Sequence, residues 1–353
     1  KKPSGVWIMS YTNGLDKPSD YFNTKLYTGT GSSQSITGVG FQPDWVWIKN
    51  RSGTDWHILT DAVRGATKEL YSNATNAEDT NSNQLTSFNS DGFSIGGASE
   101  TGRNSANFAS WNWKAGGSAS SNSNGTETST VSANTTAGFS IMTYSGTTAV
   151  DTYGHGLSQK PEIIFIKRRT FTGQWIVYNK TIGATHNLHL DSTDASSAYQ
   201  YFFNNTEPTS SVITLSDDGE VNKAGSNYVA YVFHSVQGYS KIGSYTGNNN
   251  ANGPFVYTGF KPAWLMIKIA SGTTNNWMMY DNKRSTFNLT DKIFEANNSG
   301  AEGTGLGIDM LSNGFKIRTT AGNGTNYNGG SYIYMAFAEN PFVTSTGVPA
   351  TAR

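Results

Sequence analysis

One short segment of the chain, GFSIG at residues 92–96, matches a known catalytic pattern. It fits G-x-S-x-G, in which Ser94 would be a nucleophile on a sharp turn between a strand and a helix. Here the preceding pair Asp91–Gly92 is instead typical of a hairpin turn, and a related segment further along has Asn313–Gly314 there. That related segment also carries Lys316 at the position of Ser94. We therefore interpret Ser94 as a hairpin residue and expect no catalytic role for it.

Metal-ligating residue types are present but poorly arranged for a metal site. The densest acidic cluster, Asp217, Asp218 and Glu220 in SDDGEV, offers oxygen ligands of the kind that Ca²⁺ prefers. We interpret it as a turn equivalent to the one at Asp91. The histidines are dispersed, and the closest two are three residues apart, which places them on opposite faces of a strand. We expect neither a metal site nor a cofactor from these five residues, His57, His155, His186, His189 and His234.

Three polar residues, Asp61, Asn179 and Asp281, fall at near-equivalent points of the chain. A position that accepts Asn is better suited to forming a turn than to acting as a catalytic carboxylate. Paired-carboxylate glycosidase chemistry remains open in principle, because two acids can meet from distant points of a fold. No sequence pattern points to it, and no phosphate-binding loop or H-E-x-x-H motif is present. We expect no enzymatic activity.

The overall composition excludes several classes of protein. The chain has 353 residues and zero net charge, with 25 basic and 25 acidic residues and no run of like charge, so nucleic-acid binding is not expected. It has no cysteine and therefore no disulfide framework. It also lacks an apolar stretch of the roughly 20 residues that a membrane helix needs. Because the chain begins without Met, we expect it to be a fragment or a processed product.

Several features recur along the chain at nearly constant offsets. GFQPDWVWIK at residues 40–49 returns as GFKPAWLMIK at 259–268 and, more loosely, as GLSQKPEIIFIK at 156–167. Such agreement over long distances indicates internal repeats. The recurring residues, spaced by 117 to 119 and then by 101 or 102 positions, are Lys49, Lys167 and Lys268; Leu70, Leu188 and Leu289; Trp56, Trp175 and Trp277; and Tyr27, Tyr144 and Tyr245.

The repeats predict an all-β protein. Each is built of short segments with a period of two, rich in Trp, Tyr, Ile, Val and Thr and separated by Gly, Asn and Asp. We predict three diverged tandem repeats of about 100 residues, each a small antiparallel β-sandwich or jelly-roll-like unit. The alternative is a pseudo-threefold ring of β-modules. The predicted divisions are an N-terminal lead-in (1–18), repeat 1 (19–117), a flexible Ser/Asn/Thr-rich linker (118–135), repeat 2 (136–236), repeat 3 (237–343) and a C-terminal tail (344–353).

The recurring segment GFQPDWVWIK could be an aromatic binding platform or part of a core. In a strand, Trp45 and Trp47 point to one face and Val46 and Ile48 to the other, so both faces are apolar. The counterparts of the two tryptophans in the other repeats include Ile, Phe and Met, which do not provide flat indole rings. We therefore predict a buried central strand.

Long ordered segments of the chain resemble a known family. They include YFNTKLYTGTGSSQSITGVGFQPDWVWIKNRS, DAVRGATKELYSN, GPFVYTGFKPAWLMIK and YIYMAFAENPF, and the resemblance extends from about Asp20 to Phe342. The chain is similar to a repeated domain of undetermined function that is widespread in tailed bacteriophages, especially marine ones. Members are usually virion structural or tail proteins. The family has no established catalytic or binding residues to transfer.

This resemblance implies a virion protein on the surface of an extracellular particle. We expect a tail or fibre component that contributes to host attachment, with loops that differ between repeats contacting a surface glycan or a protein receptor. Examples of such loops are residues 75–84 and 196–210. The alternative is a capsid-surface fibre or decoration protein with a purely structural role. The expected partners are other virion proteins and further copies of the chain, most simply a trimer.

Overall fold

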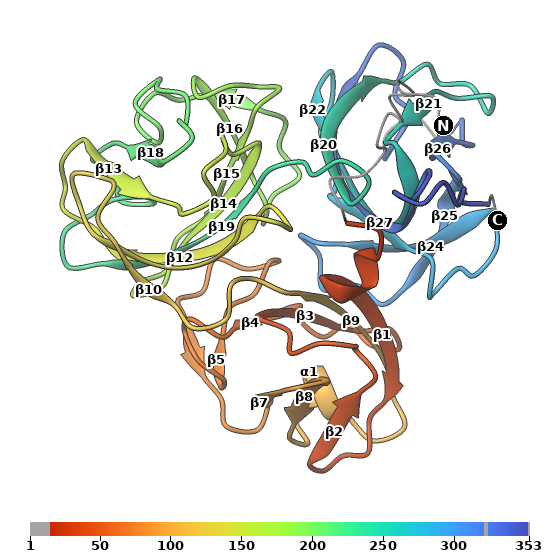
Figure 1. Ribbon diagram of the computed structural model, residues 1–353, viewed down its shortest axis with the longest axis horizontal. Coiled ribbons are helices and arrows are strands. Elements are labelled where there is room, and N and C mark those ends of the chain that lie inside the picture. The colour runs from red at the N-terminus through yellow and green to blue at the C-terminus, as the bar shows by residue number, and fades with distance from the viewer. Residues whose placement is uncertain (1–14, 321–323, 352–353) are drawn as a thin grey trace, which may run out of the picture.

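The protein consists of three β-sheet lobes arranged around a common centre (Figure 1). The computed structural model describes residues 15–320 and 324–351. Its strands pair antiparallel throughout, which confirms the predicted all-β class. The helices in this described part, η1 (Pro18–Asp20) and α1 (Ser99–Gly102), have three and four residues and are far too short to cross a membrane.

The first lobe, here called the first unit, is a two-layer sandwich. Its inner sheet has the order β1-β9-β3-β4 and its outer sheet the order β2-β8-β7. Apolar side chains from both sheets form a core that belongs to this unit alone. The strands are β1 (Phe22–Thr28), β2 (Gln34–Thr37), β3 (Trp45–Asn50), β4 (Ile58–Asp61), β5 (Lys68–Glu69), β6 (Asp79–Thr80), β7 (Leu85–Asn89), β8 (Gly92–Ile95) and β9 (Asn107–Trp113).

The second unit repeats this plan in a larger sheet. The order β12-β19-β14-β15 matches β1-β9-β3-β4, and the small outer sheet is the pair β13-β18. Its eight-stranded sheet continues at both edges, through β11 and β10 on one side and β16 and β17 on the other. The strands are β10 (Ser120–Asn122), β11 (Ser129–Asn134), β12 (Phe139–Ser145), β13 (Asp151–Gly154), β14 (Ile163–Arg168), β15 (Trp175–Asn179), β16 (His186–His189), β17 (Ser197–Ala198), β18 (Val212–Leu215) and β19 (Asn227–Phe233).

The third unit forms both of its layers from one continuous sheet. The order is β20-β27-β22-β23-β24-β25-β26-β21, and β20-β27-β22-β23 again matches the inner sheet of the first unit. Side chains from both ends of this sheet meet in a third private core. The strands are β20 (Ser240–Thr246), β21 (Phe255–Tyr257), β22 (Phe260–Ser271), β23 (Met278–Asp281), β24 (Thr290–Glu295), β25 (Gly303–Leu311), β26 (Gly314–Ile317) and β27 (Ser331–Pro341).

The inner sheets have two buried faces, and strand β3 illustrates why. Val46 and Ile48 point into the private core of the first unit, whereas Trp45 and Trp47 point into a core shared by all three units. All four side chains are at most 3% exposed. The prediction of a buried central strand is therefore confirmed.

The shared core closes the three units into a ring. Aromatic rings meet across each boundary: Trp45 lies 4.2 Å from Tyr231, and Trp113 lies 5.6 Å from Trp264, measured between ring centroids. The ring centroids of Phe233 in the second unit and Phe337 in the third unit are 6.0 Å apart. Every unit thus contacts both others, which corresponds to the ring alternative rather than to independent tandem sandwiches.

The predicted flexible linker, residues 118–135, is instead part of a sheet. Strands β10 and β11 lie within it, and β11 pairs with β12 from Thr130 to Asn134. Val131 is buried and contributes to the core of the second unit. The Ser- and Thr-rich composition suits an edge strand that is only partly covered, and this composition was misread as a linker. Most of the predicted lead-in, residues 1–14, lies outside the described residues.

One of the recurring tryptophans is matched one residue away from its structural counterpart. Strand pairing aligns Ile48 with Ile58 in the first unit, so His57 rather than Trp56 is the structural counterpart of Trp175 and Trp277. Trp56 is 40% exposed.

The third member of the leucine series is also corrected. Pairing of Met279 with Phe294 makes Phe294 the counterpart of Leu70 and Leu188, and Leu289 is 46% exposed. The connection between β23 and β24 is longer than its counterparts, and this insertion shifted the match.

Candidate functional site

The structure places Ser94 in a hairpin, as predicted. Strands β7 and β8 pair around a turn at Asp91, with Asn89 opposite Gly92. The Ser94 hydroxyl lies 3.2 Å from that of Ser35 and accepts a hydrogen bond from the Asn89 amide at 2.9 Å. Among residues 15–320 and 324–351, neither a histidine nor a carboxylate hydrogen-bonds to this hydroxyl to activate it as a nucleophile.

The acidic cluster forms a turn, but not the turn that was expected. Strand β18 corresponds to β8, so Asp218 follows that strand instead of preceding it. Asp218 corresponds to Ala98 at the start of α1. The backbone carbonyl of each accepts hydrogen bonds from the N–H groups of the residues three and four positions later in the chain. The Asp218 carboxylate accepts the Glu220 N–H at 2.7 Å. Among residues 15–320 and 324–351, no three His, Cys, Asp or Glu side chains gather as metal ligands would.

The histidines lie apart and serve packing. Burial lowers the pKa of His57 well below its usual value and that of His155 to about 4, so both are uncharged at neutral pH. His57 Nδ1 accepts a hydrogen bond from Trp47 Nε1 at 2.8 Å. His155 Nδ1 accepts one from the Leu157 N–H at 3.2 Å.

The three equivalent polar residues are turn formers, as predicted. The Oδ1 atoms of Asp61 and Asp281 accept the N–H of the residue three positions later, each at 2.8 Å. Asn179 Oδ1 accepts the N–H of Thr181 at 2.9 Å. The second carboxylate oxygen of each Asp has a further role at the boundary with the next unit.

At the boundary between the first and second units, a buried arginine pairs with the carboxylate of Asp61. Arg64 has no exposed side-chain surface and donates to Asp61, to Glu78 at 3.0 Å and to the Tyr231 hydroxyl at 3.2 Å. Burial lowers the pKa of Arg64, but the charge of Asp61 and its other partners outweigh this and raise it overall. Tyr231 belongs to the second unit and also donates to Asp61, at 2.8 Å.

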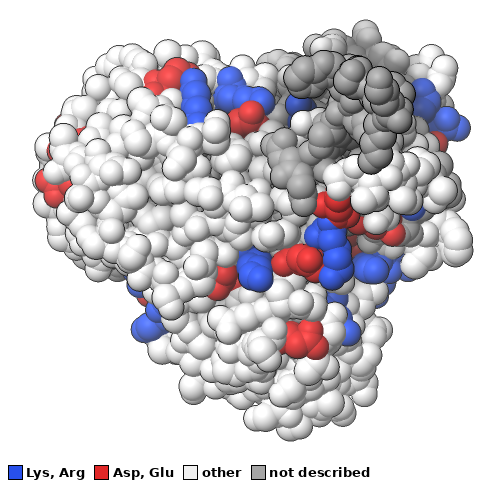
Figure 2. All heavy atoms as spheres, in the orientation of Figure 1, with Lys and Arg blue, Asp and Glu red and all other residues white. Residues whose placement is uncertain are grey.

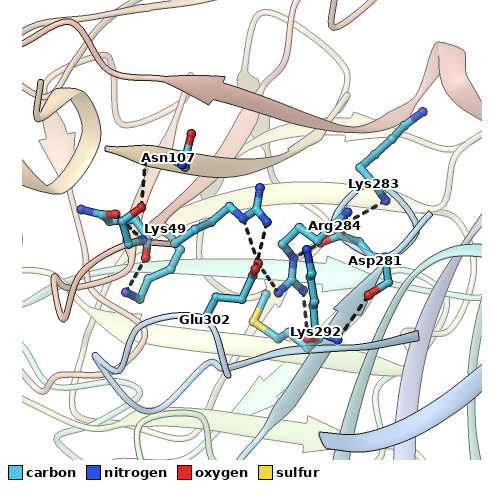
Figure 3. Close-up of polar contacts among 12 residues, drawn as sticks. Lys49, Asn107, Asp281, Lys283, Arg284, Lys292 and Glu302 are labelled. Carbon is cyan, nitrogen blue, oxygen red and sulfur yellow. Dashed lines mark hydrogen bonds and ion pairs between the residues drawn. The ribbon is translucent and has the colours of Figure 1, made fainter. Parts of the chain in front are cut away.

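The same arrangement recurs between the third and first units (Figure 3). Arg284 is fully buried, pairs with Asp281 and lies 3.4 Å from Glu302. Asp281 accepts a hydrogen bond at 3.1 Å from the indole N–H of Trp111 in the first unit. Trp111 occupies the position that Tyr231 has in the second unit.

A further ion pair joins the two units across each of these boundaries, whereas the two buried aspartate–arginine pairs each lie within one unit. Arg169 donates two hydrogen bonds to Glu78, at 2.8 and 2.9 Å, and Arg51 donates two to Glu302 at the same distances. Burial alone would raise the pKa of Glu78. The hydrogen bond from Arg169 and the charge of Arg64 outweigh this effect and hold the pKa below its usual value.

The boundary between the second and third units lacks these charges. At the other two boundaries, the backbone N–H groups of Glu78 and Glu302 donate to the backbone carbonyls of Arg169 and Arg51. At the boundary between the second and third units, the corresponding bond runs from the Ser196 N–H to the Ala270 carbonyl at 2.9 Å. The turn at this boundary is formed by Asn179 in place of Asp. Its third following residue, Ile182, packs against the shared core where the other units have arginine.

The loop that follows Ser196 carries an exposed pair of tyrosines. Tyr199 is 38% exposed and Tyr201 is 49% exposed, with ring centroids 5.4 Å apart and planes at 65°. The Tyr199 hydroxyl donates to Asp218 at 2.8 Å, and this bond raises the pKa of Tyr199 to about 12. The rings border a surface groove of about 420 Å³, here called the tyrosine groove, lined by Thr185, Ala198, Tyr199, Gln200, Tyr201 and Asn205.

The tyrosine groove combines flat apolar rings with amide and hydroxyl groups. Tyrosine rings pack well against apolar C–H surfaces while their hydroxyls remain available for hydrogen bonds. Gln200 and Asn205 add amide donors and acceptors at the same surface. The arrangement suits a sugar ring, which has an apolar face and a polar rim.

Sequence reasoning identified this loop as variable but missed its tyrosines. In AYQYFF, four aromatics occur within five residues, and only the structure separates exposed Tyr199 and Tyr201 from buried Phe202 and Phe203. The corresponding loops, TNAEDTNSNQ and NNSGAEGTG, contain no aromatic residue, and this difference was the available signal.

The surface around these features has few charges. Figure 2 shows positive and negative side chains interspersed over one face, without a large area of either sign. This agrees with the zero net charge of the chain. This face therefore offers no extended patch of one sign that would attract a highly charged polymer.

The extent of the ring coincides with a family match. A family model described as a domain of unknown function, DUF7483, matches residues 17–341. The chain belongs to this family. The matched range begins just before η1 and ends with the last residue of β27, so the DUF7483 domain spans all three units. The chain matches no curated protein and no solved structure.

Proposed function

We propose that this DUF7483 chain is a structural protein of a bacteriophage virion, located in the tail or its fibres, and that it contributes to host-surface attachment. The resemblance of its ordered segments to phage virion domains gives the setting. The ring supports a binding role because it holds loops of different sequence on equivalent positions of a rigid β framework.

The tyrosine groove is the observation that carries this proposal. Exposed Tyr199 and Tyr201 occur in only one of three equivalent loops, so they are not required by the β framework. Aromatic residues that are costly to expose and are not needed for folding indicate a binding surface. The proposed ligand is a surface glycan of the host, held by ring stacking and by amide hydrogen bonds.

Loop substitution tests the attachment role. The double variant Tyr199→Ser/Tyr201→Ser should reduce adsorption of particles to host cells without lowering the melting temperature. The matched control is Phe171→Ser, which removes another exposed aromatic of the second unit, 52% exposed, from outside the groove. If the tyrosine variant adsorbs as well as the control, attachment through this groove is wrong.

Immunogold electron microscopy on intact particles tests the location. Label on the tail or fibres would support the proposal, and label spread over the head would favour a capsid decoration role. Absence of label from the particle would contradict both virion roles. Sedimentation of the purified chain would test the expected trimer, since a monomer at all concentrations would exclude a homo-oligomer.

A further inference from the structure

The outer sheet of the third unit exposes aromatic side chains where its sisters expose small polar ones. Phe255 and Tyr257 lie two apart on strand β21, so their side chains point to the same face, and they are 47% and 54% exposed. Strand pairing aligns them with Ser35 and Thr37 on β2 of the first unit. The second unit has Thr and Gly at these positions. The fold therefore does not require aromatic residues at this surface.

A glycine keeps this surface flat. Gly314 lies opposite Tyr257 in the neighbouring strand, and the ring of Phe255 lies beside it. A Cβ atom at Gly314 would come within 2.1 Å of a backbone carbonyl oxygen, so no side chain can stand beside the Phe255 ring at this position. Across the sheet from Phe255 stands Lys316, whose ammonium group donates to the Gly253 carbonyl at 2.8 Å.

A small cleft adjoins Tyr257. It has a volume of about 220 Å³ and is lined by hydroxyl groups, backbone and one cation, Lys241. The ammonium group of Lys241 forms no hydrogen bond or ion pair with any residue in the described part of the chain. Ser235, which lines the cleft, donates hydrogen bonds to the carboxylate of Glu162. That carboxylate is already paired with Lys180 at 2.7 Å. The cleft thus presents an unpaired positive charge.

We propose that Phe255 and Tyr257 form a binding platform for an acidic polysaccharide. Successive sugar rings would stack on the two aromatic rings, and their carboxylates would pair with Lys241 in the cleft and with Lys316 at the other end. The site is separate from the tyrosine groove, lies in a different unit and differs from it in selecting an anionic ligand.

Titration calorimetry with oligogalacturonate tests this site, with the methyl-esterified oligomer as a neutral ligand of the same ring structure. The parent chain should bind the acid form, and binding should weaken with added salt. Phe255→Ser/Tyr257→Thr, which introduces the residues of the first unit, should weaken binding about tenfold or more. Lys241→Gln should abolish the preference for the acid over the ester. Unchanged melting temperatures would show that the variants fold.

Several results would overturn the proposal. Equal binding of acid and ester would refute the anionic ligand, and unchanged binding by the Phe255/Tyr257 variant would refute the platform. Absence of binding to galacturonate, mannuronate and sialylated oligomers would refute both. A parent chain that self-associates while this variant is monomeric would show an interface between copies instead. Tyr199→Ser/Tyr201→Ser should bind the acid oligomer normally, which separates this test from that of the attachment groove.

Discussion

The buried ion pair at the first boundary should tolerate loss of both partners better than loss of one. Asp61 and Arg64 have no exposed side-chain surface. Arg64→Ile alone leaves the second Asp61 oxygen with only the Tyr231 hydroxyl as a partner. Isolating one member of a buried pair typically costs about 3 to 5 kcal/mol. We expect a loss of this size in the free energy of unfolding.

The double variant Asp61→Asn/Arg64→Ile recreates the arrangement of the second unit. There Asn179 forms the same turn through its side-chain oxygen, and Ile182 packs against the shared core. Glu78 loses its contact with Arg64 but keeps both hydrogen bonds from Arg169, so its charge still has a partner. Replacing a whole buried pair costs much less than breaking it, so we expect about 1 to 2 kcal/mol.

Urea unfolding of the parent, both single variants and the double variant measures this as a double-mutant cycle. The two substitutions should have a coupling energy of about 2 kcal/mol or more. The corresponding pair in the third unit, Asp281 and Arg284, provides an independent repetition. Additive effects of the two substitutions would refute the reasoning, because they would mean that the charges do not depend on each other.

Three further predictions concern the core, the pH dependence and the sheets. Trp45→Ala should cost about 3 to 5 kcal/mol in urea unfolding, whereas exposed Trp56→Ala should cost far less; similar losses would contradict the shared core. Burial raises the pKa of Glu69 to about 7 from 4.5, so the folded state binds more protons between these values and stability falls as pH rises through them. The free energy of unfolding of Glu69→Gln should therefore equal that of the parent near pH 4.5 and exceed it by on the order of 2 kcal/mol at pH 8. A difference in unfolding free energy that does not change with pH would refute the assignment. Gly314→Ala should lower the melting temperature, and Gly300→Ala, where a Cβ meets nothing closer than 3.7 Å, should not.

The periodicity of the sequence was sufficient to predict the framework. Alternation around Trp45 predicted a strand buried on both faces, because each face carried apolar residues without a polar break. The repeated offsets located equivalent strands in all three units. The errors had two causes. The longer connection before β24 displaced the leucine match to Leu289, and Trp56 was matched by residue type although His57 holds the equivalent position in a segment of the same length as in the second unit.

The candidate sites could not be predicted in the same way. Asp61 and Asp281 were identified as turn formers, but their cross-boundary partners Tyr231 and Trp111 come from other units and have no local signal in the sequence. Exposure likewise depends on register. Phe255 and Tyr257 read as ordinary strand residues until pairing places them on the solvent side of an outer sheet.

The tyrosine groove lies where the distribution of charge around the ring differs. In the first and third units, Glu78 and Glu302 lie within the corresponding loops, and an arginine of the neighbouring unit donates two hydrogen bonds to each carboxylate. In the second unit the loop begins at Ser196, whose N–H and hydroxyl bind only the Ala270 carbonyl, each at 2.9 Å. A loop without the ionic anchor has fewer fixed side chains at its base and can accept insertions at little cost. The longest and most aromatic of the three loops is thus the one at the boundary where no ion pair joins the two units among residues 15–320 and 324–351.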